Sequence, residues 1–291
     1  MCVVGRRMMW SLLLLPLCLI ACDHKEKPIV LPHSKGLPSE VLLVTDDAVG
    51  QSDVMDSLNA LTQQCLPEIM QPETMFRVLR VSQRNYTQRY ITMHTKLFVN
   101  IDKSLSAPMM GISRDVEATP QTEVTVSAPS LNELRLFLSH HQQQVTDALL
   151  DGQLLVRMTD LRKHHNAHVA NEVRRHMGYS ICVPKNVCAV KKGKHFLWAG
   201  SNLQERDLNI VLYEFPWDGK PMDNAEQLVS KRDSVMKCNI PGEKEGQWMQ
   251  TSRVDGNALV MCRRRNLQGR EFVEMRGMWD VRKAPIGGPF V

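Results

Sequence analysis

Short apolar or alternating runs, each the length of one β-strand, recur along residues 40–279 and constrain the fold more than any other feature. The first, Glu40–Thr45, is a buried-strand pattern, and such patterns outnumber helical ones. Asp255-Gly256 joins two of them as a tight turn, which is typical of an antiparallel hairpin. The strand patterns cover residues 40–45, 76–81, 96–101, 123–127, 179–183, 195–199, 208–215, 247–254, 257–264 and 271–279.

Helical periodicity separates several of these strands. We expect helices at Ser52–Cys65, at Ser130–Leu150, from there to about Met177 after an interruption at Asp151-Gly152, and at Asn224–Lys237. The order predicts an α+β fold with mostly antiparallel sheets packed against helices, rather than a regularly alternating parallel α/β fold. A diverged duplication of two related halves stays open, although no sequence repeat supports it.

The chain of 291 residues, 43% of them hydrophobic, is long enough for one or two packed cores. We predict a signal peptide over residues 1–21 and a lipidated N-terminus with a tether over 22–39. An N-terminal α+β half follows over residues 40–150, and a C-terminal α+β half over 151–291.

The export signal has three parts. Arg6 and Arg7 precede an apolar run, Met8–Ile20, which is shorter than the ~20 residues that cross a bilayer. Leu19-Ile20-Ala21-Cys22 then resembles the lipobox of bacterial lipoproteins, which implies cleavage after Ala21 and lipid on Cys22. The alternatives are an ordinary signal peptide with an incidental cysteine, or a buried N-terminal helix.

Charge is unevenly distributed. The net charge of +5 is too small to suggest a nucleic-acid partner, but residues 157–194 carry nine basic and two acidic residues. This segment could attract anionic lipid headgroups, lipopolysaccharide or a polyanionic glycan. It could equally be the solvated face of a long amphipathic helix.

Eight cysteines are present, and the signal and the lipid account for Cys2, Cys18 and Cys22. Because an exported chain permits disulfides, we consider a Cys182–Cys188 bond across a turn, with buried free thiols as the competing interpretation.

Sequence patterns give little support for catalysis. His164, His168 and Glu172 follow i, i+4 spacing and could ligate a metal ion on one helix face, but no HExxH motif is present and Arg174 and Arg175 lie close by. We therefore predict no metal. No Walker loop, GxGxxG or Gly-x-Ser-x-Gly motif occurs, so no cofactor and no catalytic residue is assigned.

A set of aromatic and polar residues in the second half could form a carbohydrate or peptide site. In the competing interpretation Asp233 pairs with Lys237 on a helix surface and the tryptophans belong to the core. The candidate ligand-binding residues are Trp198, Asn202, Arg232, Asp233, Arg276 and Trp279.

Several segments resemble Bacteroidota lipoproteins of the domain-of-unknown-function family 4837, over nearly all of residues 36–291. The most specific are Arg232-Asp233-Ser234-Val235-Met236 and Gly287-Gly288-Pro289-Phe290-Val291. The resemblance implies a lipoprotein and provides no catalytic residues. Members of the family continue beyond the second segment into a further strand and a terminal helix. The resemblance therefore implies a truncated C-terminal half, whose last predicted strand, Glu271–Trp279, would lack a neighbour.

Together these observations predict a cell-envelope lipoprotein, anchored to a membrane through its N-terminal lipid, at the periplasmic or surface face of the outer membrane. We expect a binding or scaffolding role toward a glycan, a peptide or another envelope protein, with an enzyme acting on envelope glycans as the alternative. No nucleic-acid partner is expected.

Overall fold

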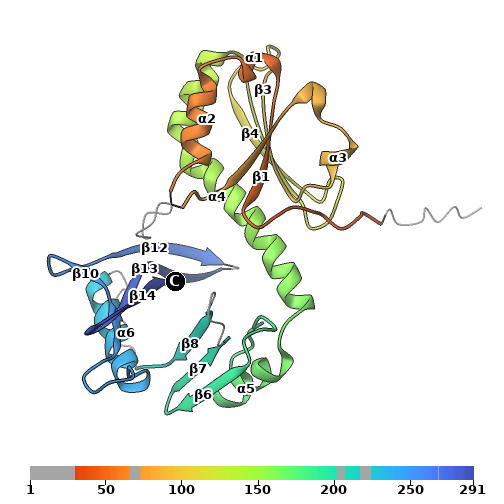
Figure 1. Cartoon of the computed structure of the whole chain (residues 1–291). Helices are drawn as coiled ribbons and strands as arrows, with labels where there is room; N and C mark the ends of the chain where they lie inside the picture. Colours follow the sequence, from red (N-terminus) through yellow and green to blue (C-terminus); the bar gives the residue numbers. More distant parts are fainter. Residues whose placement is uncertain (1–29, 66–72, 202–206, 217–223, 268) are drawn as a thin grey trace, which may run out of the picture. The chain divides into compact units, whose positions relative to one another are not determined.

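Figure 1 shows a computed structural model of the chain, which describes residues 30–65, 73–201, 207–216, 224–267 and 269–291. The predicted signal peptide, Ala21, Cys22 and Asn202 lie outside these ranges. None of the helices within the ranges is long and apolar enough to cross a membrane.

The first half is built on a five-stranded sheet in the order β2-β1-β3-β5-β4. All pairs are parallel except β4 with β5. Strands of a parallel sheet are covered on both faces, which explains why β1 is a continuous apolar run with five consecutive buried residues. The strands are β1 (Glu40–Thr45), β2 (Arg77–Ser82), β3 (Thr95–Ile101), β4 (Met109–Arg114) and β5 (Thr122–Ala128).

Helices α2 (Val54–Thr62) and α4 (Leu131–Lys163) pack on one face of this sheet, with the short α1 (Asp47–Gly50) beside them (Figure 1). Their apolar side chains and those of β1, β3 and β5 form the largest buried cluster. The opposite face carries a smaller cluster around Leu42 and Val44. It is covered by a segment containing the 3-10 helix η1 (Gln83–Asn85) and α3 (Gln88–Ile91), which supplies Tyr86 and Tyr90.

The long helix α4 differs from the predicted pair of helices. It begins with an N-cap at Ser130, whose hydroxyl accepts from the Glu133 N–H and donates to the Glu133 carboxylate. It then continues through the expected interruption at Asp151-Gly152. Gly152 is buried, and a Cβ there would lie 2.9 Å from Cβ of Thr122, so this glycine allows a close approach to β5 instead of ending a helix. The non-helical backbone lies at His141.

A second core begins at α5 (Ala167–Met177), which Asn166 caps and Gly178 ends with a φ of 76°. The helix packs on an antiparallel sheet of β6 (Ala189–Gly193), β7 (Phe196–Gly200) and β8 (Asn209–Tyr213). The strand predicted at Tyr179–Val183 is wrong. This segment is irregular, although Val183 itself is fully buried in the cluster.

The last sheet has β13 (Arg270–Val281) at its centre, paired with β12 (Val260–Leu267), β14 (Ala284–Phe290) and β9 (Met249–Thr251). Helix α6 (Ala225–Asn239) packs against β9 and β12. The turn at Asp255-Gly256 is confirmed, since both residues have positive φ and connect β10 (Arg253–Val254) to β11 (Asn257–Ala258). The expectation that Glu271–Trp279 lacks a neighbour is wrong, because β12 pairs with it along one side as far as Gly277 and the Gly-Gly-Pro-Phe segment forms β14, which pairs with Gly277–Trp279 on the other side.

The predicted α+β class, with mostly antiparallel sheets and helices packed on them, is confirmed. The mainly parallel sheet of the first half is the exception, and the two halves have different topologies.

Candidate functional site

A lysine inside the first sheet is the most unusual polar residue of the described chain. Along β3, Leu97 and Val99 point toward α2 and α4, so Lys96 and Phe98 point to the opposite face. The Lys96 side chain has no exposed surface. A lysine is almost never fully buried unless its charge is paired, so its partners are the first question.

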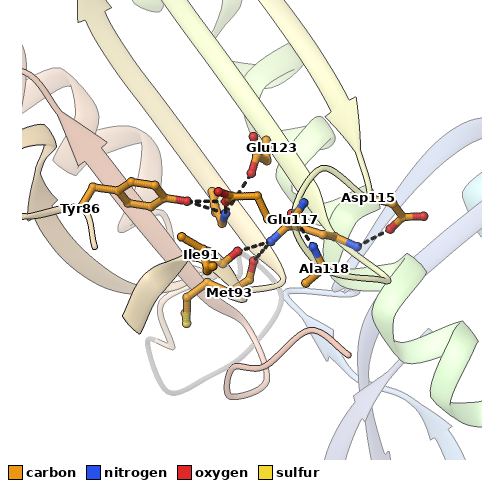
Figure 2. A network of polar contacts seen from close by, with 9 residues as sticks. Tyr86, Ile91, Met93, Asp115, Glu117, Ala118 and Glu123 are labelled. Atoms are coloured by element: carbon orange, nitrogen blue, oxygen red, sulfur yellow. Dashed lines mark hydrogen bonds and ion pairs between the residues drawn. The ribbon is translucent and has the colours of Figure 1, made fainter. Parts of the chain in front are cut away.

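Three oxygens surround the Lys96 ammonium group, and Figure 2 labels the residues that carry them, Tyr86, Glu117 and Glu123. Nζ lies 2.6 Å from Tyr86 Oη, 2.7 Å from Glu117 Oε2 and 2.9 Å from Glu123 Oε1. Because an ammonium group has three N–H donors, these contacts use all of them. The Tyr86 hydroxyl in turn donates to Glu117 Oε2 at 2.8 Å.

Each partner comes from a different element. Glu123 stands opposite Lys96 in the parallel register of β3 and β5. Tyr86 follows η1, in the segment that covers this face of the sheet. Glu117 lies in the connection between β4 and β5. The ion network therefore ties two strands, a covering segment and a loop together.

Gln121, which is fully buried, fixes the loop that carries Glu117. Its Nε2 donates to the carbonyl oxygens of Ile91 at 2.7 Å and Met93 at 2.8 Å. Its Oε1 accepts from the backbone N–H of Glu117 at 2.9 Å and of Ala118 at 3.3 Å (Figure 2). Every polar atom of the amide is bonded, so the position of Glu117 is set by a buried side chain.

The network stabilises the charged form of Lys96, the neutral form of Tyr86 and the charged form of Glu117. Burial opposes the charge of Lys96, but the hydrogen bonds that it donates to Glu117, Tyr86 and Glu123 outweigh burial and raise the pKa of Lys96 above 10.5. Burial raises the pKa of Tyr86 to about 12. Burial also acts against the charged form of Glu117, but the hydrogen bonds from Lys96 and Tyr86 outweigh it and hold its pKa below 4.5. All three shifts lead away from neutral pH.

Of the predicted ligand-binding residues, Arg232 and Asp233 lie together at the junction of α6 and β9. Asp233 Oδ1 accepts from Arg232 Nη1 at 3.1 Å and from both the backbone N–H and the hydroxyl of Thr251 at 2.8 Å. The buried Arg232 guanidinium also lies 4.0 Å from the centre of the Phe290 ring. Lys237, which the competing interpretation paired with Asp233, lies instead over the Trp248 ring.

The other predicted residues are distributed differently. Trp279 stands opposite Thr251 in the β9–β13 pair and thus lies near Arg232 and Asp233. Arg276 is three positions away on the same strand, so it points to the opposite face, where its Nε donates to Glu274. Trp198 belongs to the other sheet, where its Nε1 donates to Asn209.

The predicted histidine stripe is interrupted, because α4 ends at Lys163 and α5 begins at Ala167. His164 pairs with Asp160, and Glu172 pairs with Arg175 and Lys192. Among the described residues no group of three His, Cys, Asp or Glu side chains could hold a metal ion. Cys182 and Cys188 are exposed free thiols, and their disulfide stays a prediction.

Sequence reasoning did not identify the Lys96 network. One signal was present, since a lysine that opens an otherwise apolar strand requires a carboxylate nearby if the strand is buried on both faces. Tyr86 and Glu117 give no comparable signal, because they reach Lys96 only through tertiary structure.

Comparison with protein families divides the chain in two. Residues 34–159 match a family model described as Domain of unknown function (DUF8532), and residues 166–291 match one described as Domain of unknown function (DUF4837). The resemblance over nearly all of residues 36–291 thus holds for the second half, while the first half matches a different model. No curated protein and no solved structure matches the chain. The chain therefore carries a DUF4837 domain at residues 166–291, preceded by a DUF8532 domain at residues 34–159.

Proposed function

We propose that this chain is a cell-envelope lipoprotein, held on a membrane by lipid on Cys22, whose folded part binds or scaffolds other envelope components. The anchor rests on the apolar run that ends in Leu19-Ile20-Ala21-Cys22. Such an anchor would hold the chain on the outer membrane, on the side that faces either the periplasm or the cell surface.

The fold starts close to the proposed anchor. Ser34 donates its backbone N–H to Thr119 O at 3.1 Å, and Lys35 donates to Thr92 O at 2.7 Å. Part of the predicted tether is thus paired with the connections that precede β3 and β5 of the first sheet. The eleven peptide units between Cys22 and His33 span at most ~40 Å, which would keep the first domain near the membrane.

The observation that favours binding over catalysis is the state of the Lys96 network. A general acid or base works best with a pKa near the operating pH, and a nucleophilic lysine needs a lowered pKa. Here the pKa of Lys96 is raised, that of Tyr86 is raised to about 12 and that of Glu117 is lowered. The network holds fixed charges and a fixed loop, which suits a rigid binding scaffold.

A glycan-acting enzyme is the alternative function. A glycosidase uses two carboxyl groups, one of which has a raised pKa and donates a proton. Glu117 and Glu123 are both bonded to Lys96, and the pKa of Glu117 is shifted in the opposite direction. This pair is therefore better suited to holding the loop than to protonating a leaving group.

The anchor is tested with the full chain expressed in a bacterium that processes lipoproteins. Mass spectrometry should find acyl chains on wild type and on the control variant Cys65→Ser, and none on Cys22→Ser. The Cys22→Ser protein should also leave the membrane fraction. Acyl chains on Cys22→Ser would contradict the anchor.

Binding is separated from catalysis by incubating the protein with purified envelope glycan. The proposal expects the glycan to be recovered with unchanged mass. Cleavage that is abolished in Glu117→Gln, while the variant keeps its fold by circular dichroism, would instead establish the enzymatic alternative.

A further inference from the structure

One stretch of the second half carries almost only positive charge. Residues 162–195, which include α5, β6 and the turn into β7, contain eight lysines and arginines and one acidic residue, Glu172, so their net charge is +7. An ordinary solvated surface mixes charges of both signs. The place of this one carboxylate therefore decides whether the surface is uniformly positive.

Glu172 lies beneath two of the cations. Its Oε1 accepts from Arg175 of the same helix, and its Oε2 pairs with Lys192 of β6. Only 12% of the Glu172 side chain is exposed, against 69% for Arg175 and 44% for Lys192. The hydrogen bond from Lys192 is the main cause that holds the pKa of Glu172 below 4.5, and Arg175 adds to it. The carboxylate is thus charged at neutral pH and fixes two cations at the surface.

Two further cations lie beside this pair. Arg174 belongs to the last turn of α5 and Lys194 to the turn between β6 and β7, and both are exposed. His176 joins these two places, since its Nε2 lies 2.9 Å from Gly193 O and 3.1 Å from Phe196 O. Neither Arg174 nor Lys194 forms an ion pair within the described chain, so their charges face solvent uncompensated.

A second acidic residue adjoins the turn, but other side chains occupy it. The backbone N–H of Glu214 donates to His195 O at 3.0 Å. Its carboxylate accepts from the Tyr179 hydroxyl at 2.7 Å and lies 3.5 Å from His195 Nδ1. It pairs with none of the four cations Arg174, Arg175, Lys192 and Lys194, which we call the α5 cationic surface.

This surface suits one class of polyanion better than others. Proteins that bind single-stranded nucleic acid combine positive charge with stacking aromatic side chains, and none of the four residues is aromatic. An anionic membrane needs charge alone, and each lysine or arginine near it strengthens attachment by roughly fivefold. The proposed lipid on Cys22 would keep the chain on a membrane, where headgroups reach a high effective concentration. Charge complementarity and proximity therefore favour anionic lipid.

We propose that the α5 cationic surface docks on the anionic lipid headgroups of the membrane that holds the chain. The four cations would contact headgroup phosphates, and Glu172 would keep Arg175 and Lys192 in position for this contact. The proposal rests on the proposed lipid anchor. It adds a second membrane contact, which would fix the orientation of the domain at residues 166–291 on the bilayer.

The probe is a vesicle of defined composition. The full acylated chain is incorporated into vesicles of phosphatidylcholine alone, or into vesicles in which about a third of the lipid is phosphatidylglycerol. Lysines are acetylated to a low extent, and mass spectrometry measures the rate at each one. We expect Lys192 and Lys194 to react at least roughly fivefold more slowly on the anionic vesicles, while the exposed Lys103 of the first domain changes by less than roughly twofold.

Salt and a double variant test whether charge causes the slowing. High salt, which shortens the Debye length to about 3 Å, should remove the difference between the two vesicles. Arg174→Gln combined with Lys194→Gln removes two cations that bond no carboxylate, so the fold is kept. In this variant the slowing at Lys192 should fall below roughly twofold. The matched control, Arg77→Gln with Lys103→Gln, removes two exposed cations of the first domain and should leave the slowing unchanged.

Three results would overturn the proposal. Equal acetylation of Lys192 on the two kinds of vesicle would reject docking on anionic lipid. Slowing that persists in the double variant would show that other residues contact the membrane. Heparin that slows Lys192 on neutral vesicles as much as phosphatidylglycerol does would assign the surface to an acidic glycan.

The lipid anchor and the docking surface can fail separately. Acylation is detected on Cys22, whereas docking is detected at Lys192. If Cys22 carries no lipid, the full chain is added to the same vesicles from solution, and the difference at Lys192 still tests docking. An acylated chain without that difference would reject docking and leave the anchor in place.

Discussion

Lys96 Nζ lies 2.7 Å from Glu117 Oε2, although the Lys96 side chain is fully buried and 35% of the Glu117 side chain is exposed. The pair therefore connects the interior of the first sheet to its surface. The lysine gives up all of its hydration, and the bonds to Tyr86, Glu117 and Glu123 offset that loss. Removing any member leaves the others incompletely bonded, which makes the network directly testable.

Replacing Lys96 with methionine should strongly destabilise the first domain. Methionine fills similar space but leaves the two carboxylates without their cation, and breaking a buried pair costs about 3–5 kcal/mol. Glu117 can turn toward water, so we expect the free energy of unfolding to fall by about 3 kcal/mol, at the low end of this range. Urea unfolding measures it, with the exposed Lys103→Met as control. Equal stability of the two variants would show that the network contributes nothing.

Acid should remove part of the network's contribution. The pKa of Glu117 is lower in the folded chain than its usual 4.5, because Lys96 and Tyr86 bond the carboxylate. Such a group stabilises the fold above its unfolded pKa, and the stabilisation is lost as pH falls through the folded pKa. The stability difference between wild type and Glu117→Gln should therefore shrink below about pH 4.5. A difference that stays constant down to pH 3 would contradict the shift.

Gln121→Leu should loosen the loop that carries Glu117. Leucine leaves the carbonyl groups of Ile91 and Met93 and the N–H groups of the loop without partners, at about 1–3 kcal/mol for each group that stays buried. We expect a loss of about 3 kcal/mol in thermal unfolding and faster proteolysis within residues 115–120. The exposed Gln144→Leu provides the matched control.

The strands that the sequence did not reveal share one physical property. β4, β6 and β14 each lie at the end of their sheet in the observed strand order. An end strand has one unpaired side and a more exposed surface, so its residues need not alternate. β14 even contains two prolines and two glycines, which a strand at the sheet edge tolerates. Interior strands such as β1 and β5 were predictable because burial imposes an apolar pattern on them.

Part of the Lys96 network could have been anticipated, and part could not. Once β3 and β5 are known to pair in parallel, the register places Glu123 opposite Lys96. The sequence indicates both strands but not whether they pair in parallel or antiparallel. That depends on how the chain connects them, which no local pattern shows. Tyr86 and Glu117 reach the site from a covering segment and a loop, whose paths no local pattern describes. Arg232 and Asp233, by contrast, are adjacent in sequence, so their proximity could be predicted without the fold, whereas the ligand-binding role predicted for their set stays a prediction.

Asp233→Ala should act on stability rather than on binding alone. Asp233 joins α6 to β9 through Arg232 and Thr251, and its loss leaves the buried Arg232 without its carboxylate. We expect destabilisation by about 3 kcal/mol in urea unfolding, against little change for the exposed neighbouring variant Ser234→Ala. Unchanged stability of Asp233→Ala, together with weakened ligand binding, would support the predicted ligand-binding role instead.

His94 makes the attachment of the first described residues sensitive to mild acid. The side chain is only 3% exposed, and its Nε2 lies 3.1 Å from Leu37 O while Nδ1 lies 2.9 Å from Thr95 Oγ1. Nε2 must donate to the carbonyl group, and because the pKa of His94 lies below 6.5 the ring is neutral near pH 7, so Nδ1 accepts from the threonine hydroxyl. Protonation would require the threonine hydroxyl to reverse its bond, and it would place a charge beside Gly36, where no side chain fits between the backbone and the ring.

Burial is the main cause that lowers the pKa of His94 below 6.5, and the positive charge of Arg157 adds to it, while the Leu37 carbonyl and Glu40 act in the opposite direction. The unfolded chain therefore binds this proton more readily than the folded chain, so stability should fall as pH drops below about 6.5. Chemical denaturation at pH 7.5 and pH 5.5 measures the loss. The loss should be smaller in His94→Gln, which cannot take up the proton, and unchanged in His140→Gln, whose side chain is exposed. If His94→Gln loses as much stability between the two pH values as wild type, another group is responsible for the acid sensitivity.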